Sequence, residues 1–309
     1  MPATDAEISP ALPKSSAPSR LRIWILAIRP KTLPAAAASV IVGTALAWYD
    51  GLFSAGPALA ALGVALLLQI GSNLANDVYD DERGADTEDR LGPLRVTQSG
   101  LLTRTQVKTG MKVVFLLALT LGFYLTWVRG WMVLVIGVVA IVAAVAYTGG
   151  PWPLGYHGLG EVFVFLFFGV TAVVGTYWVQ AGATTASAWL MSVPVGLLIT
   201  AIIVVNNLRD VEQDRVAGKR TVAVRIGVRA TRAEYALCVA GAYMCVTLGV
   251  VLQLLPAYAL LSWLSAPLAV VTWQIVATQA GTPLNRALAL TGQTALLFSV
   301  FFALGMLLA

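Results

Sequence analysis

The sequence has few of the residues on which most soluble enzymes depend. Its 309 residues include one histidine, two cysteines and fifteen carboxylates, and charged residues make up only 11% of the composition. So low a charge content excludes an ordinary soluble globular domain. No Ser-His-Asp or Cys-His constellation is recognisable, so we expect no nucleophile supplied by the protein. Cys238 and Cys245 lie seven residues apart on one predicted helix, a separation that excludes a disulfide between them.

Apolar residues take the place of the missing charges. They make up 58% of the chain, and the mean hydropathy is +0.81. Runs long enough to cross a bilayer recur along the whole chain. The sequence therefore predicts an all-α, polytopic membrane protein with nine transmembrane helices around a central cavity. The predicted spans are 33–49, 55–75, 107–128, 131–147, 161–180, 188–208, 233–255, 258–278 and 287–308.

The basic residues predict the orientation of these spans. With nine spans, nineteen of the twenty Lys and Arg residues fall on one side of the membrane, and only Arg129 lies opposite. By the positive-inside rule that side is cytoplasmic, so we expect a multi-pass plasma-membrane protein with its N-terminus inside and its C-terminus outside. The net charge of +5 then reflects the orientation of the spans, or the binding of anionic lipid headgroups or of an anionic substrate. We expect no nucleic-acid partner.

The N-terminal segment differs from the rest of the chain. Residues 1–28 contain several prolines and no signal-peptide core, and they predict a disordered segment that ends in a short interfacial piece near 21–28. Residues 29–309 form the predicted transmembrane domain.

Two acidic clusters stand out because acids are so scarce elsewhere. Residues 76–80 (NDVYD) follow the second predicted span and residues 207–214 (NLRDVEQD) follow the sixth, and ten of the fifteen acids lie between 77 and 89 or between 210 and 214. Carboxylates at the edge of a bilayer are costly to desolvate unless a cation offsets their charge. Both clusters lie on the predicted cytoplasmic face, so we expect them to bind a divalent cation there.

The spacing within each cluster supports a shared metal site. If the spans continue as helices, the polar residues fall three or four positions apart and form one stripe on each helix. An isolated acid pair at a helix end is ordinarily a solvated cap, but two similar copies argue for two pseudo-repeated units that meet at a central site. Mg²⁺ prefers such oxygen ligands and would share them with a diphosphate. The predicted ligands are Asn76, Asp77, Asp80, Asp86, Asp210 and Asp214, with Asn73 and Asn207 on the same stripes.

These motifs resemble a known family. Residues 76–80 with Gly84 and Asp86, paired with Asp210 and Asp214, are similar to the two aspartate-rich motifs of the UbiA superfamily of intramembrane aromatic prenyltransferases. The strings RPKTLP at 29–34, LGPLRVTQSG at 91–100 and AGKRT at 217–221 are most similar to the 1,4-dihydroxy-2-naphthoate branch of that superfamily. Many members have an Asp where this chain has Gly84, and the naphthoate branch shares the departure.

The resemblance implies a reaction and roles for its residues. A polyprenyl group would pass from an allylic diphosphate to 1,4-dihydroxy-2-naphthoate, with loss of diphosphate and CO2, to give demethylmenaquinone. Asp77, Asp80, Asp210 and Asp214 would hold Mg²⁺, and Lys31, Arg95, Arg215 and Lys219 would hold diphosphate oxygens. Tyr147 or Tyr156 would stabilise the allylic cation through its ring face.

Three alternatives stay open at this stage. Another aromatic acceptor, such as 4-hydroxybenzoate or homogentisate, would suit the same motifs. A secondary transporter also combines repeats with membrane carboxylates, although its site normally lies near mid-bilayer. The single histidine, His157, lies in a Gly- and Pro-rich connection and is interpreted as structural, or as part of a cap over the acceptor pocket.

Overall fold

The computed structural model describes residues 18–85 and 90–309, and this part of the chain folds as helices without any β-strand. Eight helices are long and apolar enough to cross a membrane. The prediction of an all-α, polytopic membrane protein is confirmed. The helices are α1 (Arg20–Ile28), α2 (Leu33–Tyr49), α3 (Ala55–Glu82), α4 (Arg104–Arg129), α5 (Met132–Ala146), α6 (Gly160–Val164), α7 (Gly175–Ala181), α8 (Ala186–Arg209), α9 (Val211–Val216), α10 (Val222–Val251), α11 (Ala266–Thr278) and α12 (Leu284–Leu308).

Shorter helical pieces complete the chain. They are η1 (Pro30–Thr32), η2 (Leu154–His157), the π-helical η3 (Phe165–Val174) and η4 (Ala257–Ser265). Helices α1, η1 and α2 run on as one membrane-crossing segment, as do α6, η3 and α7, and also η4 and α11. The two glycines Gly169 and Gly196 let η3 and α8 approach closely, because a Cβ on Gly169 would lie 2.7 Å from the Cα of Gly196.

The expected count of nine spans is met only in part within the described residues. The fourth predicted span corresponds to α5, which has 15 residues and is shorter than the other crossing segments. Such a helix rises about 22 Å, less than the roughly 30 Å of the hydrocarbon core. Helix α10 begins at Val222, earlier than predicted, and bends at Gly227, which has a positive φ of 79°. The two pseudo-repeated units stay a prediction.

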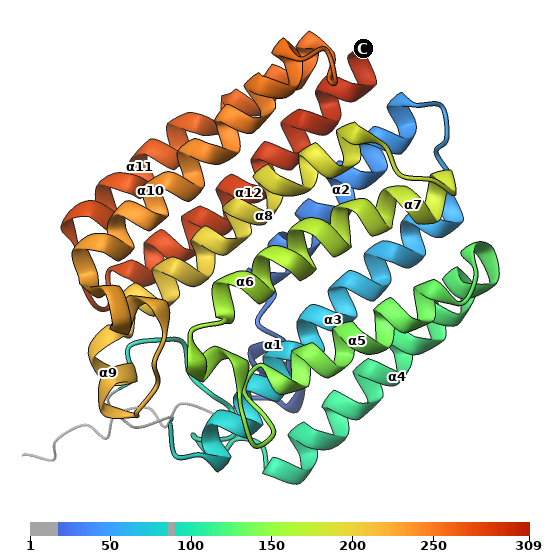
Figure 1. The fold of residues 1–309 in the computed structure, drawn as a ribbon. Helices are drawn as coiled ribbons and strands as arrows, with labels where there is room; N and C mark the ends of the chain where they lie inside the picture. Colours follow the sequence, from blue (N-terminus) through green and yellow to red (C-terminus); the bar gives the residue numbers. More distant parts are fainter. Residues whose placement is uncertain (1–17, 86–89) are drawn as a thin grey trace, which may run out of the picture.

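The helices pack around a buried centre formed by α2, α8 and α12. Helix α8 contacts α10, η3 and α12, while α12 also contacts α2. Large side chains such as Tyr177 and Phe298 are fully buried where these helices meet. A second apolar cluster joins α1, α3 and α4. Figure 1 shows α9 and the segment that follows α3 at the end of the bundle opposite the C-terminus.

Both acidic motifs lie at that same end. The first occupies the last turns of α3, and the second runs from the end of α8 through Asp210 into α9. Gly84 and Gly218 both have positive φ values, which allow the chain to turn directly after each motif. The predicted disordered segment falls mainly on residues 1–17, outside the described residues, whereas 20–28 form helix α1.

Candidate active site

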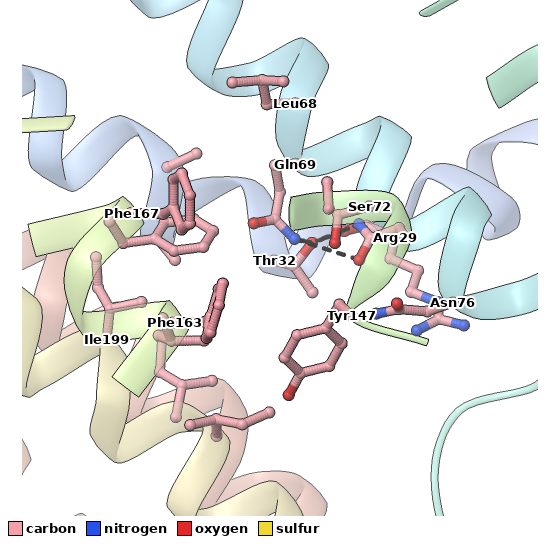
Figure 2. A pocket seen from close by; sticks show the side chains of 18 of the residues that line it. Arg29, Thr32, Leu68, Gln69, Ser72, Asn76, Tyr147, Phe163, Phe167 and Ile199 are labelled. Atoms are coloured by element: carbon pink, nitrogen blue, oxygen red, sulfur yellow. Dashed lines mark hydrogen bonds between the residues drawn. The ribbon is translucent and has the colours of Figure 1, made fainter. Parts of the chain in front are cut away.

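A cavity of about 1140 Å³ lies inside the helix bundle. Its polar end contains the carboxylates and bases of the two motifs. Apolar side chains from α3, α4, α5, η3 and α7 line the rest. Figure 2 shows Tyr147, Phe163 and Phe167 around this space, with Gln69 and Asn76 on the α3 side. The cavity therefore joins a charged end to a long apolar chamber.

Asp80 lies at the polar end and is 3% exposed. One carboxylate oxygen accepts a hydrogen bond from the Tyr156 hydroxyl at 2.7 Å, and the other pairs with the Arg95 guanidinium at 2.9 Å. These partners come from the two loops that follow α3 and α5. One turn earlier, Asn76 accepts a hydrogen bond from the Thr148 hydroxyl at 3.0 Å. Asn76 and Asp80 are four residues apart, so the helix places both on the cavity side.

Asp214 provides the matching carboxylate from the second motif. Burial raises the pKa of its carboxyl to about 6, although the neighbouring Lys219 acts to lower it. The Lys219 ammonium lies 3.6 Å from Asp80 and 3.8 Å from Asp214. It also lies over the Tyr156 ring, 4.6 Å from the centroid. One lysine therefore links the acids of both motifs, which are far apart in the sequence.

Asp210 is held by its neighbour Arg209, a residue for which the sequence predicts no role in the site. The buried Arg209 guanidinium contacts both Asp210 oxygens, at 2.7 and 2.5 Å, and donates to Asn285 of α12 at 2.7 Å. Its position directly before Asp210 at the end of an apolar run was the available signal. A buried arginine at that point needs carboxylate and amide partners.

Glu161 is a second polar residue that the sequence interpretation missed. It lies on α6 and is 7% exposed, and Oε1 accepts a hydrogen bond from the Asn207 side chain at 2.7 Å. Asn207 itself lines the cavity. The sequence signal was a lone acid at the start of an otherwise apolar span, where burial of a carboxylate is costly and commonly functional.

Asp77 was expected to be a metal ligand, but within the part of the chain that the structure describes it is not among the residues that line the cavity. Its carboxylate faces the segment that follows α3, where the backbone N–H groups of Val96 and Thr97 donate to it. Asp86 falls outside the described residues.

The remaining predicted residues separate into two groups. Lys31, Arg95, Tyr147 and Lys219 line the cavity. Asn73 also lines it, but its amide donates to the Ile28 carbonyl and the Thr32 hydroxyl, both at 2.8 Å. Arg215 is different, because α9 turns its side chain toward solvent. The side chain is 54% exposed and pairs with Glu212 at 2.6 Å. It is not among the described residues that line the cavity.

His157 makes structural contacts. Its ring stacks on Trp152 with centroids 4.3 Å apart, and Nδ1 lies 2.9 Å from the Pro153 carbonyl.

The donor set at the polar end suits a hard divalent cation. Asn76, Asp80, Asp210 and Asp214 supply oxygen atoms from two helix ends, and an ammonium group already lies between two of the carboxylates. Within the described residues, no three acidic, His or Cys side chains are close enough to hold a metal by themselves. A magnesium ion here would therefore need further oxygens from a bound ligand, as Mg²⁺ commonly does with phosphates.

Residues 36–300 match the model of the UbiA prenyltransferase family. The 1,4-dihydroxy-2-naphthoate octaprenyltransferase of Escherichia coli strain K12 is 39% identical over 298 residues, which cover 94% of this chain and 97% of the relative.

The chain belongs to the UbiA prenyltransferase family.

Solved structures of the family share the fold. The apo structure of a UbiA homolog from Aeropyrum pernix K1 superposes with a TM-score of 0.69 at 16% identity and covers 91% of this chain and 98% of that one. A UbiA homolog from Archaeoglobus fulgidus bound to GPP and Mg²⁺ gives 0.66 at 15% identity, with coverage of 92% and 99%. The UbiA fold therefore extends over almost the whole chain.

Proposed function

We propose that this protein transfers a polyprenyl group from an allylic diphosphate to 1,4-dihydroxy-2-naphthoate, with loss of diphosphate and CO2, to give the reduced, quinol form of demethylmenaquinone. The observation that carries the proposal is Lys219 between Asp80 and Asp214, at the charged end of a long apolar cavity. That arrangement suits a ligand with a diphosphate head and a hydrocarbon tail. The acceptor is inferred from the relatives, which bear the name 1,4-dihydroxy-2-naphthoate octaprenyltransferase.

In this proposal Asn76, Asp80, Asp210 and Asp214 would hold Mg²⁺, and Asp86 is a further predicted ligand. Bound Mg²⁺ would neutralise charge on the departing diphosphate. Lys219 and Arg95, which contact Asp80, and Lys31, which also lines the cavity, would bind its remaining oxygens. Lys219 then exchanges carboxylate partners for phosphate partners. The structure of a UbiA homolog from Archaeoglobus fulgidus bound to GPP and Mg²⁺ supports the choice of ligands, a prenyl diphosphate and Mg²⁺.

The apolar chamber protects the reaction from water. Departure of diphosphate with the electron pair of the C–O bond leaves an allylic cation, which water would capture. The rings of Tyr147, Phe163 and Phe167 surround the space beside the polar end (Figure 2) and present apolar faces to the cation. The ring carbon that bears the carboxylate forms the new C–C bond. The bond to the carboxylate then breaks, and its electron pair returns to the ring as CO2 leaves.

The orientation is also part of the proposal. Nineteen of the twenty basic residues accompany the acidic motifs to one face, which the positive-inside rule makes cytoplasmic. The charged end of the cavity then opens toward soluble substrates, and the tail region lies within the plasma membrane.

A test of the function uses purified protein, Mg²⁺, one polyprenyl diphosphate and a panel of aromatic acids, with products identified by mass. With carboxyl-labelled 1,4-dihydroxy-2-naphthoate, we expect one labelled CO2 for each prenyl group transferred. Label retained in a prenylated product would refute the coupled decarboxylation. Turnover of 4-hydroxybenzoate or homogentisate alone would move the protein to another branch. Inactivity with every acceptor, together with transport of a small solute into vesicles, would favour a transporter.

A further inference from the structure

The segment formed by residues 91–97, here called the lid segment, covers the polar end of the cavity. Pro93, Leu94 and Arg95 line that end. The Leu91 carbonyl accepts a hydrogen bond from the Asn285 amide of α12 at 2.7 Å. Gly92 packs against Arg209, because a Cβ on Gly92 would lie 2.9 Å from a guanidinium nitrogen. The first part of the lid segment is therefore held by α8 and α12.

Asp77 holds the other end of the lid segment. Its Oδ1 accepts the backbone N–H of Thr97 at 2.9 Å, and its Oδ2 accepts that of Val96 at 3.2 Å. Asp77 is 1% exposed, and Val96 and Thr97 are also buried. The guanidinium of Arg29 lies 3.5 Å from Oδ2 and balances part of the charge. Each oxygen of the Asp77 carboxylate therefore accepts a hydrogen bond from the main chain of the lid segment.

Asp77 and Asp80 therefore have different kinds of partner although they lie on one helix, three residues apart. Asp80 contacts the side chains of Tyr156, Arg95 and Lys219, which can turn toward a ligand without moving the backbone. Apart from the Arg29 guanidinium, the partners of Asp77 are backbone groups, which move only if the whole segment moves. A shift of Asp77 toward the cavity would leave two buried N–H groups without their acceptor, at substantial cost.

We propose that Asp77 is a positioning residue that fixes the lid segment over the diphosphate end, and that it is not a metal ligand. Arg95 lies directly before the two anchored residues, so the anchor sets the place of its backbone, from which the guanidinium reaches Asp80 at 2.9 Å. The anchor also limits the access of water to the charged end of the cavity. The proposal rests on prenyl transfer as the function, but the anchoring itself is open to measurement without turnover.

The test compares Asp77→Asn and Asp77→Ala with Asp80→Asn in the full-length protein. Hydrogen exchange at Val96 and Thr97 should accelerate at least tenfold in Asp77→Ala, and by less in Asp77→Asn, which keeps one carbonyl acceptor. Affinity for Mn²⁺ with inorganic diphosphate, measured by electron paramagnetic resonance, should stay within about threefold in both Asp77 variants and fall at least tenfold in Asp80→Asn.

Turnover supplies a second readout. In Asp77→Asn we expect a higher KM for the prenyl diphosphate and a larger fraction of prenyl alcohol, formed when water captures the cation. Unchanged exchange at Val96 and Thr97 in the Asp77 variants would overturn the anchor. Loss of Mn²⁺ affinity equal to that of Asp80→Asn would show that Asp77 is a ligand. If Asp77→Ala does not fold, the same two measurements on Asp77→Asn decide. Absence of prenyl transfer in the unsubstituted protein would refute the proposed function and leave the exchange result standing.

Discussion

The Asn207 side-chain amide donates a 2.7 Å hydrogen bond to Glu161, and both residues are buried. In this contact the Glu161 oxygen is the acceptor, so it faces the NH2 group of the amide. The Asn207 oxygen is then turned away from Glu161, and Asn207 is one of the residues that line the cavity. Glu161 thus selects which atom of Asn207 is offered to a ligand.

Glu161→Gln should therefore reduce prenyl transfer, because a glutamine can also donate and so permits the Asn207 amide to turn over. We expect a loss of about tenfold, equivalent to roughly 1.4 kcal/mol, with steady-state rates as the measurement. Glu234→Gln is the control, since Glu234 is another partly buried acid of the membrane helices that does not line the cavity. Equal losses in the two variants, or none in Glu161→Gln, would contradict the orienting role.

Lys219→Ala should weaken binding of the prenyl diphosphate. Its ammonium lies between Asp80 and Asp214, and removing it leaves two carboxylates without their shared cation. We expect KM for the diphosphate to rise at least tenfold, while KM for the aromatic acid changes little. Arg215→Ala is a matched control, because Arg215 is an exposed base four residues away and should stay within about twofold. Equal damage to both substrates in Lys219→Ala would indicate a folding role instead.

Asp80→Asn and Asp214→Asn should each reduce turnover by more than about a hundredfold, or roughly 2.7 kcal/mol. Each change removes a formal charge from the proposed metal site and leaves the side-chain shape almost unchanged. Asp81→Asn is the control, since Asp81 is adjacent to Asp80 but pairs with Arg104 at 2.6 Å outside the cavity. Retention of more than a tenth of the rate in either site variant, with normal membrane insertion, would remove that residue from the metal site.

Gly137→Phe should shorten the prenyl chain that the cavity accepts. Gly137 of α5 lines the apolar chamber, and a Cβ placed there would have no heavy atom within 4 Å, so the added ring would occupy cavity space. We expect kcat/KM for a long polyprenyl diphosphate to fall about tenfold relative to that for farnesyl diphosphate. Val138→Phe changes the next residue, which is 44% exposed on the outer face of α5, and should leave the ratio unchanged. An unchanged ratio in Gly137→Phe would place the tail elsewhere.

The sequence by itself determined the class of protein and the position of its polar ends. Apolar runs predict membrane helices because the cost of burying charge in a bilayer is local to each segment. For the same reason, acids clustered at the ends of α3 and α8 indicated one functional face. Helical spacing also predicted that Asn76 and Asp80 lie on the same side of their helix. In the structure both residues line the cavity.

Only the tertiary structure decided what each polar residue touches. Asp77 fits the predicted stripe by spacing, yet its oxygens bind backbone amides from a segment about twenty residues away. Arg209 acquires its role from Asn285 on α12. Glu161 on α6 acquires its role from Asn207 on α8. Periodicity fixes the direction of a side chain relative to its own helix. Its partners depend on the loops and helices that pack against that face, and burial makes those partners obligatory.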